Sequence, residues 1–311
     1  MTFSEPSYLK TYETGLLQKK VAEAHSRLKS CMLCPRECGV DRLSGETGFC
    51  STGKLSRVSS FSPHFGEEAP LVGNHGSGTI FFTHCNLLCL FCQNFDISHQ
   101  GQGQEATADE LAGIMLALQH QGCHNINFVS PSHVVPQILA AAAVAVENGL
   151  NVPLVFNTGG YDRVSTLKLL EGVFDIYMPD FKFWDSLVAE DSCRAADYPE
   201  VARKALIEMH RQVGDLQIDE TGIARCGLLI RHLVLPGGLA GTREIMRFIA
   251  QNISTASYVN VMSQYRPCGR AAEVKGLGMP LAPEDYREAV RAAKDEGITR
   301  LDQPHRRYVF R

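Results

Sequence analysis

The sequence of 311 residues has no long hydrophobic segment, no strong excess of either charge and only one tryptophan. Its longest apolar run, residues 138–146, is far shorter than the about 20 residues of a membrane-spanning helix. The polar first ten residues lack the apolar core of a signal peptide. The formal net charge of −4 gives no basis for general nucleic-acid binding. We therefore expect a cytoplasmic protein with neither a membrane nor a nucleic acid as its partner.

Cysteine, in contrast, is abundant. In the cytoplasm thiols stay reduced, so the 11 cysteines are not expected to form a disulfide framework. Those between residues 31 and 92 are clustered, which indicates metal binding or catalysis. Cys123, Cys193 and Cys226 are expected to pack as small hydrophobic side chains. Cys268 is expected to be an ordinary loop thiol, with a hydrogen-atom donor as the alternative.

The apolar pattern predicts an α/β fold. After an N-terminal helix over residues 8–29, residues 51–78 are expected to be mostly loop and short strand. From residue 79 onward, strand patterns alternate with helical ones. The predicted strands are 79–83, 125–129, 152–157, 174–178, 228–235 and 258–262, and the predicted helices begin at 107, 134, 164, 198, 242 and 283.

Six strand–helix units predict a partial (β/α)6 TIM-type barrel with a small cysteine-rich N-terminal extension. The expected division is an extension over residues 1–75, a core barrel over 76–302 and a C-terminal tail over 303–311. In such a barrel, function is expected at the C-terminal ends of the strands.

The first predicted strand leads directly into Cys85, Cys89 and Cys92, spaced C-x3-C-x2-C. A [4Fe–4S] cluster normally takes four cysteine ligands. Three thiolates leave one iron open to a small molecule. The alternative is a structural zinc site with His84 as the fourth ligand. The position directly after the first barrel strand favours the iron–sulfur cluster.

This loop resembles the signature of the radical S-adenosylmethionine superfamily. In that superfamily the cofactor's methionyl amine and carboxylate chelate the open iron. An electron from the cluster then cleaves the cofactor to a 5′-deoxyadenosyl radical, which abstracts hydrogen from the substrate. The resemblance implies that Phe91, just before the third cysteine, packs on the adenine.

The similarity covers most of residues 31–302 and is closest to the proteins related to pyruvate formate-lyase activating enzyme. The motifs are 31–38 (CMLCPREC), 64–68 (HFGEE), 76–82 (GSGTIFF), 92–94 (CQN), 157–161 (NTGGY), 175–182 (DIYMPDFK), 231–237 (RHLVLPG) and 264–267 (QYRP). The resemblance implies an oxidoreductase that receives electrons from flavodoxin or ferredoxin and activates a glycyl-radical enzyme. The alternatives are radical modification of a small molecule or another protein, and a non-catalytic iron–sulfur electron-transfer protein.

Several cofactor contacts are implied by the same resemblance. The implied residues are Phe91, Ser130, Asn157, Thr158, Asp180, Lys182 and Arg231. Among them, Lys182 and Arg231 suit the cofactor's carboxylate. Asn157, Thr158, Asp180 and the Met178 carbonyl match positions that cradle a monovalent cation.

The chain departs from the family at residues 128–133 (FVSPSH), where Gly-Gly-Glu is usual. Here the Ser130 hydroxyl or backbone carbonyls would accept from the methionyl amine. The loop with His64, Glu67 and Glu68 is expected either to reach over the barrel mouth or to be a solvated loop.

A second cysteine set has the spacing C-x2-C-x3-C-x11-C and consists of Cys31, Cys34, Cys38 and Cys50. Four thiolates suit either a structural zinc ion or a second iron–sulfur cluster. The site is accordingly expected to be a zinc knuckle that clips the N-terminal arm to the barrel, or an electron relay or substrate-binding cluster.

Overall fold

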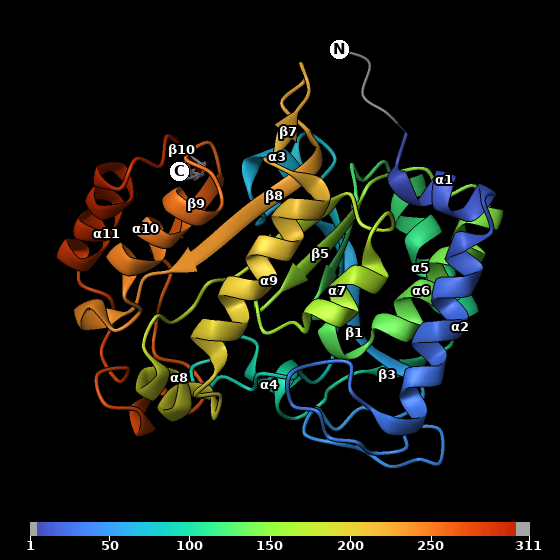
Figure 1. The fold of residues 1–311 in the computed structure, drawn as a ribbon, viewed down its shortest axis with the longest axis horizontal. Coiled ribbons are helices and arrows are strands. Elements are labelled where there is room, and N and C mark those ends of the chain that lie inside the picture. The colour runs from blue at the N-terminus through green and yellow to red at the C-terminus, as the bar shows by residue number, and fades with distance from the viewer. Residues whose placement is uncertain (1–4, 303–311) are drawn as a thin grey trace, which may run out of the picture.

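The computed structural model describes residues 5–302, which form a ten-stranded sheet with helices packed against it (Figure 1). The strands are β1 Ser56–His64, β2 Ser77–Phe82, β3 Gln104–Ala106, β4 Ile126–Val129, β5 Leu154–Thr158, β6 Ile176–Pro179, β7 Gln217–Ile218, β8 Ala224–Leu233, β9 Tyr258–Met262 and β10 Arg300–Leu301. The helices are α1 Ser7–Glu13, α2 Leu16–Ser26, α3 Ala69–Val72, α4 Phe95–Ser98, α5 Ala108–His120, α6 Val135–Glu147, α7 Val164–Leu170, α8 Ser186–Cys193, α9 Tyr198–Val213, α10 Thr242–Asn252 and α11 Pro283–Asp295. Within the described range, no helix combines the length and the apolar character needed to cross a bilayer. The predicted tail, residues 303–311, lies outside the described residues.

The sheet follows chain order through β2, β4, β5, β6, β8 and β9, all parallel. At one end of the sheet β10 pairs parallel to β9. At the other end β1 pairs antiparallel to β2, and β3 pairs antiparallel to β1. The sheet is open, with β3 and β10 at its two ends. The structure therefore confirms the α/β class and the order of the six parallel strands, and it does not confirm a barrel.

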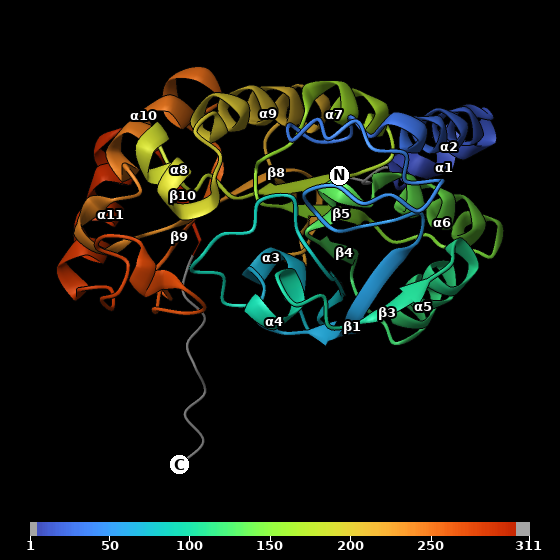
Figure 2. The same ribbon diagram turned by 90° about the horizontal axis from the view of Figure 1, so that it is seen from below.

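The helices lie on both sides of this sheet. Figure 2 shows α5, α6, α7, α9, α10 and α11 as an arc along its outer side, with the short helices α3 and α4 on the other side. Residues of β5 and β6 are buried on both faces. Phe156 and Tyr177 belong to the main core, and Val155 and Ile176 pack with Leu71 of α3. This two-sided burial explains why the parallel strands read as short, nearly continuous apolar runs.

Two N-terminal expectations were wrong. The helix predicted over residues 8–29 is broken into α1 and α2, because Gly15 adopts a left-handed conformation with φ 70°. Residues 51–78 contain the nine-residue strand β1, which pairs with β2. Its serines and Pro63 interrupt the alternation of apolar and polar residues that is typical of a strand. Its strand conformation therefore depends on pairing with β2.

The N-terminal segment packs closely on the core. The backbone N–H of Ser7 donates to Asp175 Oδ1 at 2.8 Å, and the Tyr8 hydroxyl donates to the Val152 carbonyl at 2.8 Å. Strand β1 belongs to the main sheet. The division into an extension and a core at residue 75 therefore stays a prediction.

Candidate functional site

The segment between β2 and α4, residues 83–94, is called here the three-cysteine loop. It follows the C-terminal end of β2, and its thiols Cys85, Cys89 and Cys92 line one cavity of about 270 Å³. Two of its residues, His84 and Leu88, are left-handed, with φ of 64° and 52°. Such conformations are costly for residues other than glycine and tend to occur at functional sites. Burial raises the pKa of the Cys85 thiol to about 11.

All the predicted cofactor residues line this same cavity. They are Phe91, Ser130, Asn157, Thr158, Asp180, Lys182 and Arg231. They come from the C-terminal ends of β4, β5, β6 and β8 and from the three-cysteine loop, so the parallel sheet brings together segments far apart in the chain. The sequence alone predicted this grouping; the structure does not test what the residues bind.

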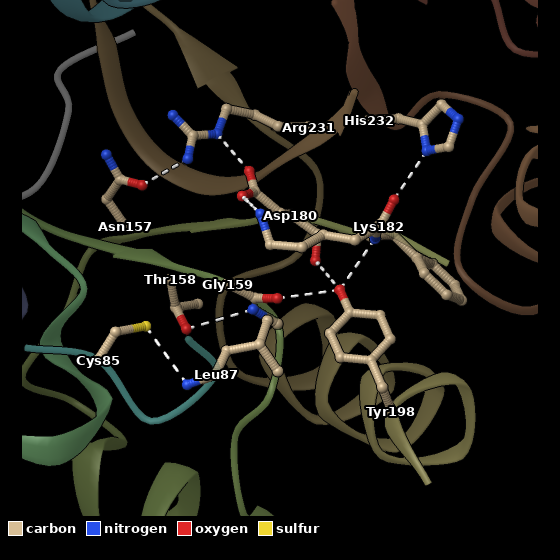
Figure 3. A network of polar contacts seen from close by, with 12 residues as sticks. Cys85, Leu87, Asn157, Thr158, Gly159, Asp180, Lys182, Tyr198, Arg231 and His232 are labelled. Carbon is tan, nitrogen blue, oxygen red and sulfur yellow. Dashed lines mark hydrogen bonds and ion pairs between the residues drawn. The ribbon is translucent and has the colours of Figure 1, made fainter. Parts of the chain in front are cut away.

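Three charged side chains of the cavity lining, Asp180, Lys182 and Arg231, are called here the charged wall. Asp180 contacts both of the others (Figure 3). Its Oδ1 accepts from Arg231 Nε at 2.8 Å, and its Oδ2 is paired with Lys182 Nζ. Arg231 also donates through Nη2 to Asn157 Oδ1 at 2.7 Å. Burial alone would raise the pKa of Asp180, but the two cations hold that pKa below its usual range. Asp180 is therefore ionised and shared between two cations.

A tyrosine from α9 fixes the backbone beneath this wall. The Tyr198 hydroxyl accepts from the Lys182 N–H at 2.9 Å and lies 2.9 Å from the Gly159 carbonyl and 3.0 Å from the Asp180 carbonyl. Gly160 passes so close that a Cβ there would lie 2.1 Å from the Asp180 carbonyl oxygen. Only glycine fits this position, which also has φ 78°.

Thr158 faces a second buried network. Its hydroxyl donates to Asp162 Oδ2 at 2.6 Å, and the Ser132 hydroxyl donates to Asp162 Oδ1 at 2.6 Å. Burial raises the pKa of Asp162 to about 6. The oxygens of Asn157 and Asp180 predicted to hold a monovalent cation already accept from Arg231, and the Thr158 hydroxyl donates to Asp162. The cation site stays a prediction.

Ser130 and Phe91 border the cavity in different ways. Ser130 is left-handed, with φ 59°, and its N–H donates to the Asn157 carbonyl at 2.9 Å. Phe91 is buried, with ring centroids 5.9 Å from Phe183 and 6.0 Å from Tyr265. The cavity lining therefore combines the aromatic ring of Phe91 with polar residues such as Ser130.

The loop with His64, Glu67 and Glu68 does not line the cavity. It approaches the cavity residue Arg231 through Glu67. Glu67 Oε2 is 3.9 Å from Arg231 Nη1, and Glu67 Oε1 is 3.0 Å from His64 Nδ1. Glu68 Oε1 accepts from Asn260 Nδ2 at 2.8 Å, and burial raises the pKa of Glu68. Both carboxyl groups are buried, so they are not part of a solvated loop.

The remaining cysteines lie outside the cavity lining. Cys123 and Cys193 are buried, and Cys226 and Cys268 are half-buried. Burial agrees with small hydrophobic packing for Cys123, whereas the Cys193 thiol donates to the Ala189 carbonyl at 3.0 Å and lies beside the Cys89 thiol. The role of Cys268 as a hydrogen-atom donor gains no support from its position.

Residues 31–50 are called here the four-cysteine knot. Its thiols line a second, much smaller pocket of about 10 Å³, which also contacts Arg42 and His133. The four residues are Cys31, Cys34, Cys38 and Cys50. Across residues 5–302, no three His, Cys, Asp or Glu side chains are already arranged around a point where one metal ion could sit. The same holds for the zinc alternative with His84.

Four residues with structural roles at these sites were missed by sequence reasoning. Tyr198 and Asp162 are ordinary residues of a helix and a loop, and only the packing shows their contacts, whereas His232 lies within the RHLVLPG motif. His232 Nδ1 donates to the Phe181 carbonyl at 2.7 Å and so ties β8 to the segment after β6. Arg36 lies within the CMLCPREC motif, so that motif was the one available signal for it.

Comparison with known proteins gives one strong match. The chain is 33% identical over 302 residues to uncharacterized protein MJ0674 of Methanocaldococcus jannaschii, covering 94% of this chain and 81% of that protein. No protein-family model matches the sequence. Among solved structures, QueE from Escherichia coli has a TM-score of 0.40 and 11% identity, covering 79% of this chain and 92% of that one. Likeness at that level carries no argument about activity.

Proposed function

We propose that this chain, which belongs to the family of protein MJ0674, is a radical S-adenosylmethionine enzyme. One observation carries the proposal: three thiols at the end of the first parallel strand share a cavity with polar side chains from the ends of the next four parallel strands. The sequence resemblance to the activating-enzyme group points to the same residues independently of the packing.

The residues of the cavity fit the group that the proposal requires. Cys85, Cys89 and Cys92 would hold the [4Fe–4S] cluster, with no fourth cysteine in the cavity lining to close the remaining iron. When bound, the cluster and S-adenosylmethionine supply reductive cleavage of the cofactor's C–S bond. Phe91 would offer an aromatic surface for the adenine.

The charged wall suits a zwitterion. Lys182 and Arg231 are balanced by Asp180 and, at 3.9 Å from Arg231, by Glu67. A methionyl group carries one carboxylate and one ammonium, so a wall with both signs can pair each of them. Arg231 and Lys182 would turn toward the carboxylate. The Ser130 hydroxyl or backbone carbonyls of residues 128–133 would accept from the ammonium, in place of the carboxylate that the family usually has there.

For the substrate, we propose a class that rests only on the sequence resemblance to the activating-enzyme group. Hydrogen abstraction from a backbone glycine of a partner enzyme, with flavodoxin or ferredoxin as electron donor, is the proposal drawn from the activating-enzyme motifs. Radical modification of a small molecule or another protein uses the same cavity residues. The two differ in the size of the substrate that must reach the end of the sheet.

The test is reconstitution of the cluster without oxygen, followed by incubation with S-adenosylmethionine and a strong reductant. We expect 5′-deoxyadenosine and methionine, detected by chromatography, even without a substrate. Fully clustered protein that never forms 5′-deoxyadenosine would instead be an electron-transfer protein. Adding a glycyl-radical enzyme and recording its electron paramagnetic resonance signal then tests the proposed substrate.

A further inference from the structure

Arg36 ties the four-cysteine knot to the three-cysteine loop. Its Nε donates to the Asn86 carbonyl at 2.9 Å, and its Nη2 lies 3.4 Å from the Leu87 carbonyl. Nη2 also donates to the Cys193 carbonyl at 2.8 Å. The guanidinium is stacked on Phe49 of the knot, 3.7 Å from the ring centroid. One side chain therefore bridges the knot, the loop between the first two loop cysteines, and the end of α8.

Arg42 makes a second connection and is itself an unusual charge. It is 1% exposed, donates to the carbonyls of Gly53 and His133 at 2.8 Å, and lies 3.9 Å from Cys31 Sγ. His133 Nε2 in turn donates to the carbonyl of Thr83, the first residue of the three-cysteine loop, at 3.0 Å. No carboxylate in residues 5–302 forms an ion pair with Arg42. A buried cation without an anion is costly, and the nearest groups that can become anions are the knot thiols.

The pocket among the knot thiols is small. Its volume of about 10 Å³ is that of roughly one water-sized sphere. That space, before any thiol moves, favours a single ion over a cube of iron and sulfur atoms. Zinc with four thiolates carries a net charge of about −2, which would supply the anion that Arg42 lacks. The thiols do not yet converge on one point, so binding must draw them together and is coupled to folding of the knot.

We propose that the four-cysteine knot binds one tetrahedral metal ion of the zinc class. In doing so it fixes Arg36 as a positioning residue for the three-cysteine loop. The metal part stands on the knot alone, whereas the positioning part rests on the proposed function, because it concerns retention of the [4Fe–4S] cluster. The two parts are tested separately.

The metal part is tested in the full chain with the three loop cysteines replaced by alanine, which removes the competing site. We expect about one zinc ion per chain by mass spectrometry. Adding Cys50→Ala should abolish it, and adding Cys226→Ala, a half-buried thiol outside both pockets, should not. If Cys50→Ala does not fold, a chelator titration of the folded triple variant should still release zinc. A folded chain without metal, or one holding about four irons with sulfide, overturns the proposal.

The positioning part is tested with Arg36→Lys, which keeps the charge and loses the planar fork of donors. The control is Arg27→Lys, whose guanidinium pairs with Glu23 outside the knot at 2.6 Å. After reconstitution, iron loss to a chelator should be roughly tenfold faster in Arg36→Lys than in the parent or the control, as for other partners that orient metal ligands. Zinc content should be equal in all three. Equal rates of iron loss overturn the positioning role and leave the cluster proposal intact.

Discussion

The two cysteine-rich segments differ in how much room their thiols enclose. The three thiols of the three-cysteine loop border a cavity of about 270 Å³, and the four thiols of the four-cysteine knot border one of about 10 Å³. Structural metal sites are closed by protein ligands, whereas reactive ones keep a position open. The segment with fewer thiols and more room is the one suited to a ligand. The number of cysteines alone would have favoured the four-cysteine knot as the ligand site.

The two segments also differ in how charge is balanced. At the open cavity, Asp180 is shared by Lys182 and Arg231. In the knot, Arg42 is buried without any carboxylate partner in the described part of the chain. The open cavity therefore has its own counter-ion before any ligand binds, and the knot does not. The predictions below separate the two segments by these differences.

Cys89→Ala should have the largest effect and should act on the open site alone. Thiolate ligation leaves no spare cysteine in the cavity lining, so loss of one ligand should strip or destabilise the cluster. We expect iron content to fall and cofactor cleavage to drop by at least about 100-fold. Iron analysis and 5′-deoxyadenosine formation measure this, with Cys226→Ala as the matched thiol control. A normal cluster and normal activity in Cys89→Ala would remove the basis for the open site.

Asp180→Asn should make the open site more like the knot, because the buried cations Lys182 and Arg231 keep only Glu67, 3.9 Å from Arg231, as a nearby carboxylate. Removing one partner of a buried ion pair leaves the other uncompensated, and we expect the free energy of unfolding of the cofactor-free chain to fall by about 3 kcal/mol. Cofactor cleavage should slow roughly tenfold while iron content is unchanged. Chemical unfolding and cleavage assays measure both. The control is Glu200→Gln, which breaks an exposed pair with Lys204; a change no larger than in that control contradicts the role of Asp180.

The parallel core was predictable from sequence because its signals are local. The helix predicted to begin at Tyr198 begins there as α9, and the predicted strand from Tyr258 to Met262 has the bounds observed for β9. The residues implied by the resemblance line one cavity, since the C-terminal ends of parallel strands meet at one edge, and their roles stay predictions. Strand β1 was missed because its pairing with β2, not its own composition, makes it a strand. The contacts of Tyr198 depend on packing between segments far apart in the chain, for which a single sequence holds no signal. For Arg36 the CMLCPREC motif marked the residue but not its contacts.

Asn157→Asp tests the cation prediction with a smaller effect. Arg231 bridges the oxygens of Asn157 and Asp180 in the present chain, so added sodium or potassium should change the cleavage rate little. A second carboxylate would add Coulombic attraction for a metal cation. We expect the cleavage rate of Asn157→Asp to depend roughly threefold more strongly on salt identity and concentration. Lithium and choline salts control for ionic strength. Equal dependence in both proteins means that Arg231 occupies this position in both.

The smallest expected effect is the contribution of Asp162 to the pH dependence of the free energy of unfolding. Asp162 accepts a hydrogen bond from Thr158, which lines the open cavity. Burial raises its pKa to about 6 in the folded chain, above the ordinary value of 3.8. The folded state therefore holds this proton more tightly than the unfolded state. The contribution is fully present below pH 3.8 and is lost as the pH rises through about 6, by roughly 1–3 kcal/mol.

Asp162→Asn cannot titrate, but it keeps an acceptor for the hydroxyls of Ser132 and Thr158. Between pH 4 and 7 the unfolding free energy of the variant should therefore fall less, or rise more, than that of the parent. Asp175, whose pKa burial also raises to about 6, is present in both proteins and cancels in the difference. Chemical unfolding of the metal-free chain at both pH values measures it. If the unfolding free energies of the parent and the variant change equally with pH, Asp162 is exposed to water in solution. Water would then reach the hydroxyl network of Ser132 and Thr158 beside the open cavity.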